Sequence, residues 1–193
     1  MTQLLTEKQI QTGIQIIRNG GLVAFQTETV YGLAADAGNK SAIQKIYEAK
    51  NRPMDKQLVL QFASIKALRA HFPNDVDEIT LNILKKFRVG LTMVLPNSTA
   101  VRIPANKFAQ KFLKACGAPL VVTSANTSSC PSAVTWNAVY DDLNGRVDAI
   151  FMSKPSKVGK PSTIIKIENG KIIILRDGAI PAQKFAKFNK ITI

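Results

Sequence analysis

Short apolar runs alternate along the sequence with longer segments of helical periodicity, and this alternation limits the possible folds more than any other feature. The apolar runs are too short for buried helices and span residues 22–25, 58–62, 91–96, 119–124 and 147–151. Helical spacing of apolar residues recurs over residues 6–19, 41–50, 64–72, 75–87, 106–117 and 136–145. This order of strands and helices predicts an α/β protein.

The last two predicted strands are joined by a short turn, whereas helical segments separate the earlier ones. Asn169 and Gly170 separate two runs rich in β-branched residues, 162–168 and 171–176, and such a pair favours a type I′ hairpin turn. A hairpin joins antiparallel strands, whereas strand-helix-strand units join parallel ones. We therefore expect a mixed, twisted, open β-sheet with flanking helices.

The bulk properties limit the class of protein further. The 193 residues contain no linker-like composition shift and no repeat, so we expect one domain over residues 1–193. The start of the chain lacks a signal-peptide pattern, and no apolar run approaches the roughly 20 residues that span a bilayer. These features favour a cytosolic protein without membrane contact. Cys116 and Cys130 have neither metal-site spacing nor nearby histidines, so we expect no metal site and no disulfide framework.

The charge balance points to an anionic partner. There are 26 lysines and arginines against 13 aspartates and glutamates, a formal net charge of +13. The sequence has no Walker-type phosphate loop, no GxGxxG and no HExxH, and its single histidine, His71, leaves little scope for a Ser-His-Asp arrangement. Any ligand site must therefore use other side chains.

Polar residues at the ends of apolar runs are the remaining candidates, because open α/β sheets bind ligands there. A polar loop is expected over residues 26–33 (QTETVYGL), directly after one strand. A loop rich in hydroxyl groups, 123–132, follows another strand. Pairing across the terminal hairpin should also bring Ser162 and Thr163 to the same end of the sheet as Arg176.

The stretch around Pro53 is unusually basic. Lys50, Arg52 and Lys56 lie between a helix and a strand. The residue before a proline is pushed towards extended backbone, and side chains two apart on an extended segment point the same way. Lys50 and Arg52 could therefore converge on one anion, with Lys56 reaching the far end of a polyphosphate.

Taken together, several of these segments resemble a known family. The segments AFQTETVYGLAADA, IYEAKNRPMDKQL, LTMVLP, VRIP, PLVVTSANTSSCPS, STII and LRDGAI occur in the order found in the YrdC-like family, the threonylcarbamoyl-AMP synthases. The resemblance runs from about Gly21 to Ile180 and is to the short form without a further C-terminal domain. It implies a twisted α/β sheet around a large positively charged concave face.

The resemblance also implies an activity and a site. The family joins L-threonine, bicarbonate and ATP into threonylcarbamoyl-AMP and pyrophosphate. The product is used to form N6-threonylcarbamoyladenosine at position 37 of tRNA, either directly or through a transferase complex. Mg²⁺ would arrive on the ATP phosphates, without a protein metal site. By resemblance the ATP-binding residues are Lys50, Arg52, Lys56, Ser124, Asn126, Ser132 and Arg176, the first two also being catalytic. The threonine-binding residues are Thr29, Gln61, Arg102 and Ser162.

The sequence departs from the family pattern at several positions. Gln26 stands where the family usually has proline, Gln61 where many members have histidine, and Ser129-Cys130 where a glycine-containing turn is usual. These departures keep open a paralogue that binds nucleotide without turnover. The net charge of +13 keeps open an RNA-binding or ribosome-maturation protein that uses the same basic face.

Overall fold

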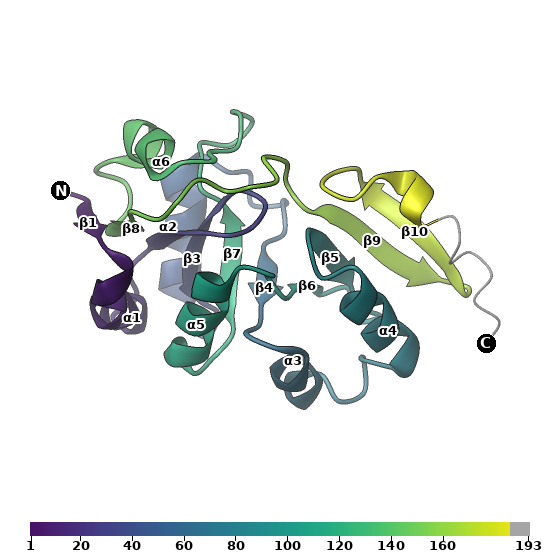
Figure 1. The fold of residues 1–193 in the computed structure, drawn as a ribbon. Helices are drawn as coiled ribbons and strands as arrows, with labels where there is room; N and C mark the ends of the chain where they lie inside the picture. Colours follow the sequence, from purple (N-terminus) through teal and green to yellow (C-terminus); the bar gives the residue numbers. More distant parts are fainter. Residues whose placement is uncertain (186–193) are drawn as a thin grey trace.

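The computed structural model describes residues 1–185 and has at its centre a mixed sheet of ten strands (Figure 1). The strands are β1 (Gln3–Leu5), β2 (Val23–Gln26), β3 (Tyr31–Asp36), β4 (Val59–Gln61), β5 (Leu91–Val94), β6 (Ala100–Arg102), β7 (Leu120–Ser124), β8 (Ala149–Phe151), β9 (Thr163–Glu168) and β10 (Lys171–Arg176). They lie in the order β1-β8-β2-β3-β7-β4-β6-β5-β9-β10, with both parallel and antiparallel neighbours. The predicted mixed α/β fold is confirmed.

Helices cover both faces of the half of the sheet that contains β2, β3 and β7. The helices are α1 (Ile10–Arg18), α2 (Lys40–Lys50), α3 (Ile65–His71), α4 (Glu78–Lys86), α5 (Lys107–Cys116) and α6 (Trp136–Leu143), with 3-10 turns η1 (Glu7–Gln9) and η2 (Ala182–Lys184). Because successive strand residues face opposite sides, Val23 and Phe25 pack with α1 and α5, whereas Ala24 packs with α2 and α6. Both faces of this half are therefore buried.

The other half of the sheet is packed on one face by α3 and α4. Leu91 and Met93 of β5, Val101 of β6 and Ile165 of β9 contribute to this core. The residues between them, such as Thr92 and Arg102, must point to the opposite face by the period-two rule for strands. That opposite face is where the site described below lies.

The terminal hairpin is confirmed in detail. Lys171 of β10 pairs with Glu168 of β9, so the loop contains only Asn169 and Gly170. Both have positive φ, 49° and 68°, as a type I′ turn requires. The pairing brings the end of β10 back to the start of β9.

Three expectations about local structure were wrong or incomplete. Tyr31–Asp36 form β3 and are not part of a polar loop, and β1 and β6 were not predicted at all. The glycine and alanines of β3 give little strand propensity, and β1 and β6 have only three residues each. Helix α2 is capped at its C-terminal end by Asn51, whose backbone is left-handed (φ 48°) and which lies two residues before Pro53. Lys50 is therefore the last helical residue and not part of an extended segment.

Residues 1–185 lack both a membrane-spanning helix and a cluster of metal-ligating side chains. None of the helices there is both long and apolar enough to span a membrane. The same residues contain no group of three or more histidine, cysteine, aspartate or glutamate side chains that could hold a metal ion. The predicted single domain extends over residues 1–193, and its last eight residues lie outside the described part of the chain.

Candidate active site

A cavity of about 440 Å³ lies on the sheet face opposite α3 and α4. Residues from both halves of the sheet line it, together with the turn after α2 and the loop after β7. Ten of the eleven site residues predicted from the sequence are among them: Lys50, Arg52, Lys56, Gln61, Arg102, Ser124, Asn126, Ser132, Ser162 and Arg176. Segments that are up to 126 residues apart in sequence (residues 50 to 176) therefore meet at one cavity.

The lining has the chemistry of an anion site. It contains five cations, which are Lys50, Arg52, Lys56, Arg102 and Arg176, and no aspartate or glutamate. Burial, together with the charges of Arg102 and Arg52, lowers the pKa of Arg176. Cations held this close to one another repel, and a bound anion would relieve the repulsion.

Lys50 is the most buried of these cations, with 1% of its surface exposed. Its Nζ donates hydrogen bonds to the backbone carbonyl oxygens of Ser124, at 2.5 Å, and Asn126. An ammonium group has three donors, so one remains for a ligand in the cavity. Burial, together with the charge of Arg52, lowers the pKa of Lys50 to about 8.

Arg52 lies across the turn that contains Pro53. Its Nε donates to the Lys56 carbonyl (3.1 Å) and its Nη2 to the Gln57 carbonyl (2.8 Å), while the Lys56 N–H donates to the Pro53 carbonyl (3.2 Å). These bonds fix the guanidinium at the cavity. The expected convergence of Lys50 and Arg52 on one cavity is observed, but the left-handed residue between them produces it.

The loop after β7 supplies hydroxyl groups to the cavity. Ser128 and Ser129 line it beside the predicted residues of this loop, although neither was selected as a site residue. Asn126 fixes the loop through its Nδ2, which donates to the carbonyls of Thr127 (2.7 Å) and Cys130 (2.8 Å). Ser129 adopts positive φ (68°), which explains why a glycine-containing turn is the usual solution at this place.

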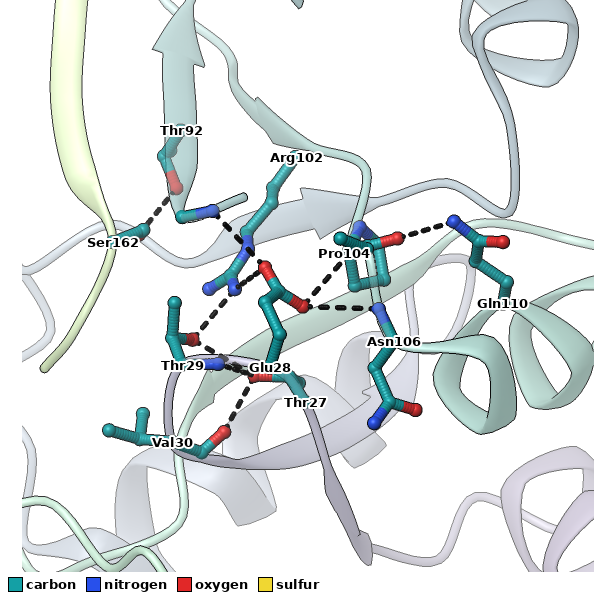
Figure 2. Close-up of polar contacts among 12 residues, drawn as sticks. Thr27, Glu28, Thr29, Val30, Thr92, Arg102, Pro104, Asn106, Gln110 and Ser162 are labelled. Carbon is teal, nitrogen blue, oxygen red and sulfur yellow. Dashed lines mark hydrogen bonds and ion pairs between the residues drawn. The ribbon is translucent and has the colours of Figure 1, made fainter. Parts of the chain in front are cut away.

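Arg102 is held by a buried carboxylate that the sequence analysis did not select. Glu28 Oε1 accepts a hydrogen bond from Arg102 Nη2 at 2.7 Å, and its Oε2 accepts from the backbone N–H groups of Ala105 and Asn106 (3.0 and 3.3 Å). Figure 2 shows Glu28 at the centre of these contacts. The signal was present in the sequence, as the single carboxylate in the stretch 26–33.

Thr29 is the one predicted site residue that does not line the cavity. It is fully buried, and its Oγ1 accepts from Arg102 Nη2 at 2.7 Å (Figure 2). Its hydroxyl then donates to Thr27 Oγ1 (2.9 Å), because the single hydroxyl proton of Thr27 goes to the Val30 carbonyl (2.7 Å). Thr29 thus contacts the guanidinium from the side away from the cavity.

Ser162 connects the terminal hairpin to the sheet. Its Oγ lies 2.7 Å from Thr92 Oγ1, and Arg176 Nε and Nη2 donate to its carbonyl oxygen (3.1 and 2.7 Å). The predicted meeting of Ser162 with Arg176 is confirmed. Thr92 lines the cavity too and was missed, because one threonine in an apolar run reads as an ordinary strand residue.

Three buried polar atoms of the lining residues have no hydrogen-bond partner within residues 1–185: Gln61 Oε1, Arg102 Nε and Asn126 Oδ1. An unpaired buried polar atom costs about 1–3 kcal/mol. Gln61 and Arg102 are register partners on β4 and β6, so an acceptor and a donor lie side by side. A ligand that carries both an anionic group and a hydrogen-bond donor would satisfy them.

The fold and the cavity define a class: an α/β protein whose mixed sheet carries a cavity lined by cations and by no carboxylate. Within that class, the chain belongs to the Sua5/YciO/YrdC family, whose model, described as "Telomere recombination", matches residues 15–178.

Similar proteins are found among both sequences and structures. The threonylcarbamoyl-AMP synthases of Pyrococcus abyssi and Bacillus subtilis are 34% and 33% identical to this chain, over 95% and 92% of it and over 58% and 56% of their own length. A crystal structure of P. abyssi Sua5 complexed with L-threonine is 30% identical, with a TM-score of 0.87, over 97% of this chain and 60% of that one. The chain therefore spans little more than half the length of these relatives.

Proposed function

We propose that this protein is a threonylcarbamoyl-AMP synthase, which joins L-threonine, bicarbonate and ATP and releases pyrophosphate. The observation that carries the proposal is the cavity itself, with five cations, no carboxylate and three unpaired buried polar atoms. The two curated relatives bear this activity as their name. The nucleotidyltransferase class follows from it.

The chemistry suits this set of side chains. The amine of threonine combines with bicarbonate to give a carbamate and water, and a carbamate oxygen then attacks the α-phosphorus of ATP as the bond to pyrophosphate breaks. Such transfer depends on positioning and on neutralising charge on the phosphates, which requires no general base in the protein. Lys50 would contribute its third N–H donor, and Arg52 its guanidinium, to the phosphates.

The amino acid would lie beside β4 and β6. Arg102 Nε can donate to its carboxylate, and Gln61 Oε1 can accept from its amine or hydroxyl group. The related P. abyssi protein was crystallised with L-threonine, which favours an amino acid ligand in this fold. Ser162 would contact the ligand directly, whereas Thr29 would act by holding Arg102.

Two further assignments belong to the same proposal. Mg²⁺ would enter as MgATP, since oxygen ligands for a hard cation come from the phosphates and the lining residues include no carboxylate. The threonylcarbamoyl group of the adenylate would then be transferred to the adenosine of tRNA with release of AMP, directly or through a transferase complex, in the cytosol.

Mass spectrometry tests the proposal directly. The purified protein is incubated with MgATP, L-threonine, bicarbonate and pyrophosphatase, and threonylcarbamoyl-AMP is sought in the mixture. Product that requires both threonine and bicarbonate would establish the activity, and reactions lacking either one are the controls. ATP binding without product would favour the paralogue without turnover. RNA affinity that falls steeply with salt, without ATP binding, would favour the RNA-binding alternative suggested by the net charge of +13.

A further inference from the structure

The end of α2 and the loop after β7 are joined by three sets of contacts. Lys50 Nζ donates to the carbonyl of Ser124, the last residue of β7, and to that of Asn126 in the loop, and the Lys50 carbonyl accepts from the Ser128 N–H at 2.7 Å. The third contact comes from outside both segments: Arg146 Nη1 donates to the Ala49 carbonyl at 2.6 Å. The position of the Lys50 ammonium therefore depends on how these segments are held together.

Asp142 and Arg146 hold the loop side of this junction. Asp142 accepts the backbone N–H of Thr127 at 2.6 Å and the Thr127 hydroxyl at 2.5 Å. Arg146 Nη2 donates to Thr127 Oγ1 and to Asp142 Oδ1, both at 3.0 Å. Thr127 directly follows Asn126, whose carbonyl binds the Lys50 ammonium. Neither charged residue lines the cavity.

We propose that Asp142 and Arg146 are positioning residues, which fix the Lys50 ammonium in the cavity and adjust its charge. Arg146 bridges the helix end to the loop through Ala49 and Thr127, and Asp142 keeps both Thr127 and Arg146 in place. The effect on turnover rests on the proposed synthase function, whereas the effect on Lys50 itself does not.

The electrostatics around Lys50 agree with the geometry. Burial lowers the pKa of Lys50 most, and the charge of Arg52 lowers it further; Asp142 raises it, Arg146 lowers it, and Cys130 raises it. Burial alone would raise the pKa of Asp142, but hydrogen bonds from Thr127 and the charge of Arg146 outweigh it and lower the pKa. Asp142 is therefore ionised at neutral pH, where it favours the charged form of Lys50.

NMR titration of Lys50 in the free protein tests the proposal without any assay of activity. The protein is labelled with ¹³C at the lysine ε carbons, and the Lys50 signal is assigned by its loss in Lys50→Gln. Asp142→Asn should lower the Lys50 midpoint by about 0.5 pH units or more, because it removes an attractive charge. Arg146→Ala should raise it, and Arg146→Lys, which keeps the charge, should leave it near the wild-type value.

The paired shifts separate the direct charge effect of the two residues on Lys50 from a loosening of the junction. A loosened junction would admit water and move the midpoint towards that of an ordinary lysine in both Asp142→Asn and Arg146→Ala. Calorimetry should also show ATP affinity reduced about tenfold in Arg146→Ala and partly restored in Arg146→Lys. The reason is that a displaced Lys50 ammonium would lose a charge-assisted contact with the phosphates, and a tenfold loss of affinity corresponds to about 1.4 kcal/mol. Arg69→Ala, on the far side of the sheet, is the matched charge control.

Each result has a definite reading. An unchanged Lys50 midpoint in folded Asp142→Asn, or an upward shift there, would overturn the charge effect, and unchanged ATP affinity in folded Arg146→Ala would overturn the positioning role. If the shifts occur as expected but wild-type protein makes no threonylcarbamoyl-AMP, the positioning role stands and the synthase proposal fails. If Arg146→Ala does not fold, Asp142→Asn and Arg146→Lys still test the proposal, because they nearly preserve the shape of the side chain.

Discussion

Arg102 and Glu28 form an ion pair of 2.7 Å whose side chains are only 7% and 10% exposed. The two residues lie 74 positions apart, and the carboxylate also accepts backbone N–H groups from residues 90, 105 and 106. These donors offset the cost of removing the carboxylate from water. The pair thus fixes one cation of the cavity and two loops at once.

Glu28→Gln should destabilise the protein by about 3–5 kcal/mol, because it leaves the Arg102 charge buried without its counter-ion. The free energy of unfolding in urea measures the loss. Glu78→Gln removes the partner of Arg69 in a pair whose side chains are 61% and 69% exposed, and should change stability little. Equal effects of the two substitutions would contradict the structural role given to Glu28.

Arg52→Ala should reduce threonylcarbamoyl-AMP formation by about 10²–10³-fold, the loss typical of removing one preorganised donor from a charged transition state. The fold should persist, since within residues 1–185 the Arg52 side chain bonds to carbonyls of its own turn and the substitution keeps its backbone N–H. Circular dichroism checks the fold and pyrophosphate release measures the rate. Turnover close to wild type would remove Arg52 from the site.

ATP affinity should fall as the pH rises above about 8, the pKa of Lys50. Below that pH the ammonium is already charged and affinity is flat. Above that pH Lys50 is neutral before ATP binds, and the bound phosphates raise its pKa, so that binding takes up a proton. ATP affinity therefore falls by up to about tenfold per pH unit. Calorimetry at pH 9 in two buffers of different ionisation enthalpy counts the protons. Lys50→Gln should abolish the uptake, and uptake that persists there would assign it elsewhere.

Ser162→Ala should raise the KM for threonine about tenfold, because it removes a hydroxyl that lines the cavity and leaves Thr92 Oγ1 without its 2.7 Å partner. Thr92→Val removes only the supporting hydroxyl and should have a smaller effect. RNA affinity, if the protein has any, should be the same in wild type and Ser162→Ala. Steeply salt-dependent RNA affinity that survives Ser162→Ala, with no effect of the substitution on threonine kinetics, would favour the RNA-binding alternative.

The sequence was most informative where local rules act alone. The positive-φ pair Asn169-Gly170 determines its turn whatever surrounds it, so the hairpin and the meeting of Ser162 with Arg176 could be predicted. Apolar runs of four to six residues likewise indicated five of the ten strands, β2, β4, β5, β7 and β8. The family resemblance predicted eleven site residues, and ten of them line the cavity.

What could not be predicted depends on tertiary contacts. Strand β3 is built from small residues and becomes a strand because β2 and β7 pair with it on both sides. The resemblance assigns threonine binding to Thr29, but its hydroxyl accepts from Arg102, which β6 brings to it, and it does not line the cavity. The contacts of Asp142 and Arg146 with Thr127 arise only when α6 packs beside the loop.

The position of Arg176 at the end of an edge strand affects how the protein becomes active during synthesis. Lys50 and Ser124 are made early, but the cavity gains Ser162 and Arg176 only when the final hairpin closes onto β5. A nascent chain can therefore assemble the α2 turn and the β7 loop before it can hold a complete ligand. Completion of the site is tied to translation of nearly the whole described chain, so a truncated product would lack the last cation of the cavity.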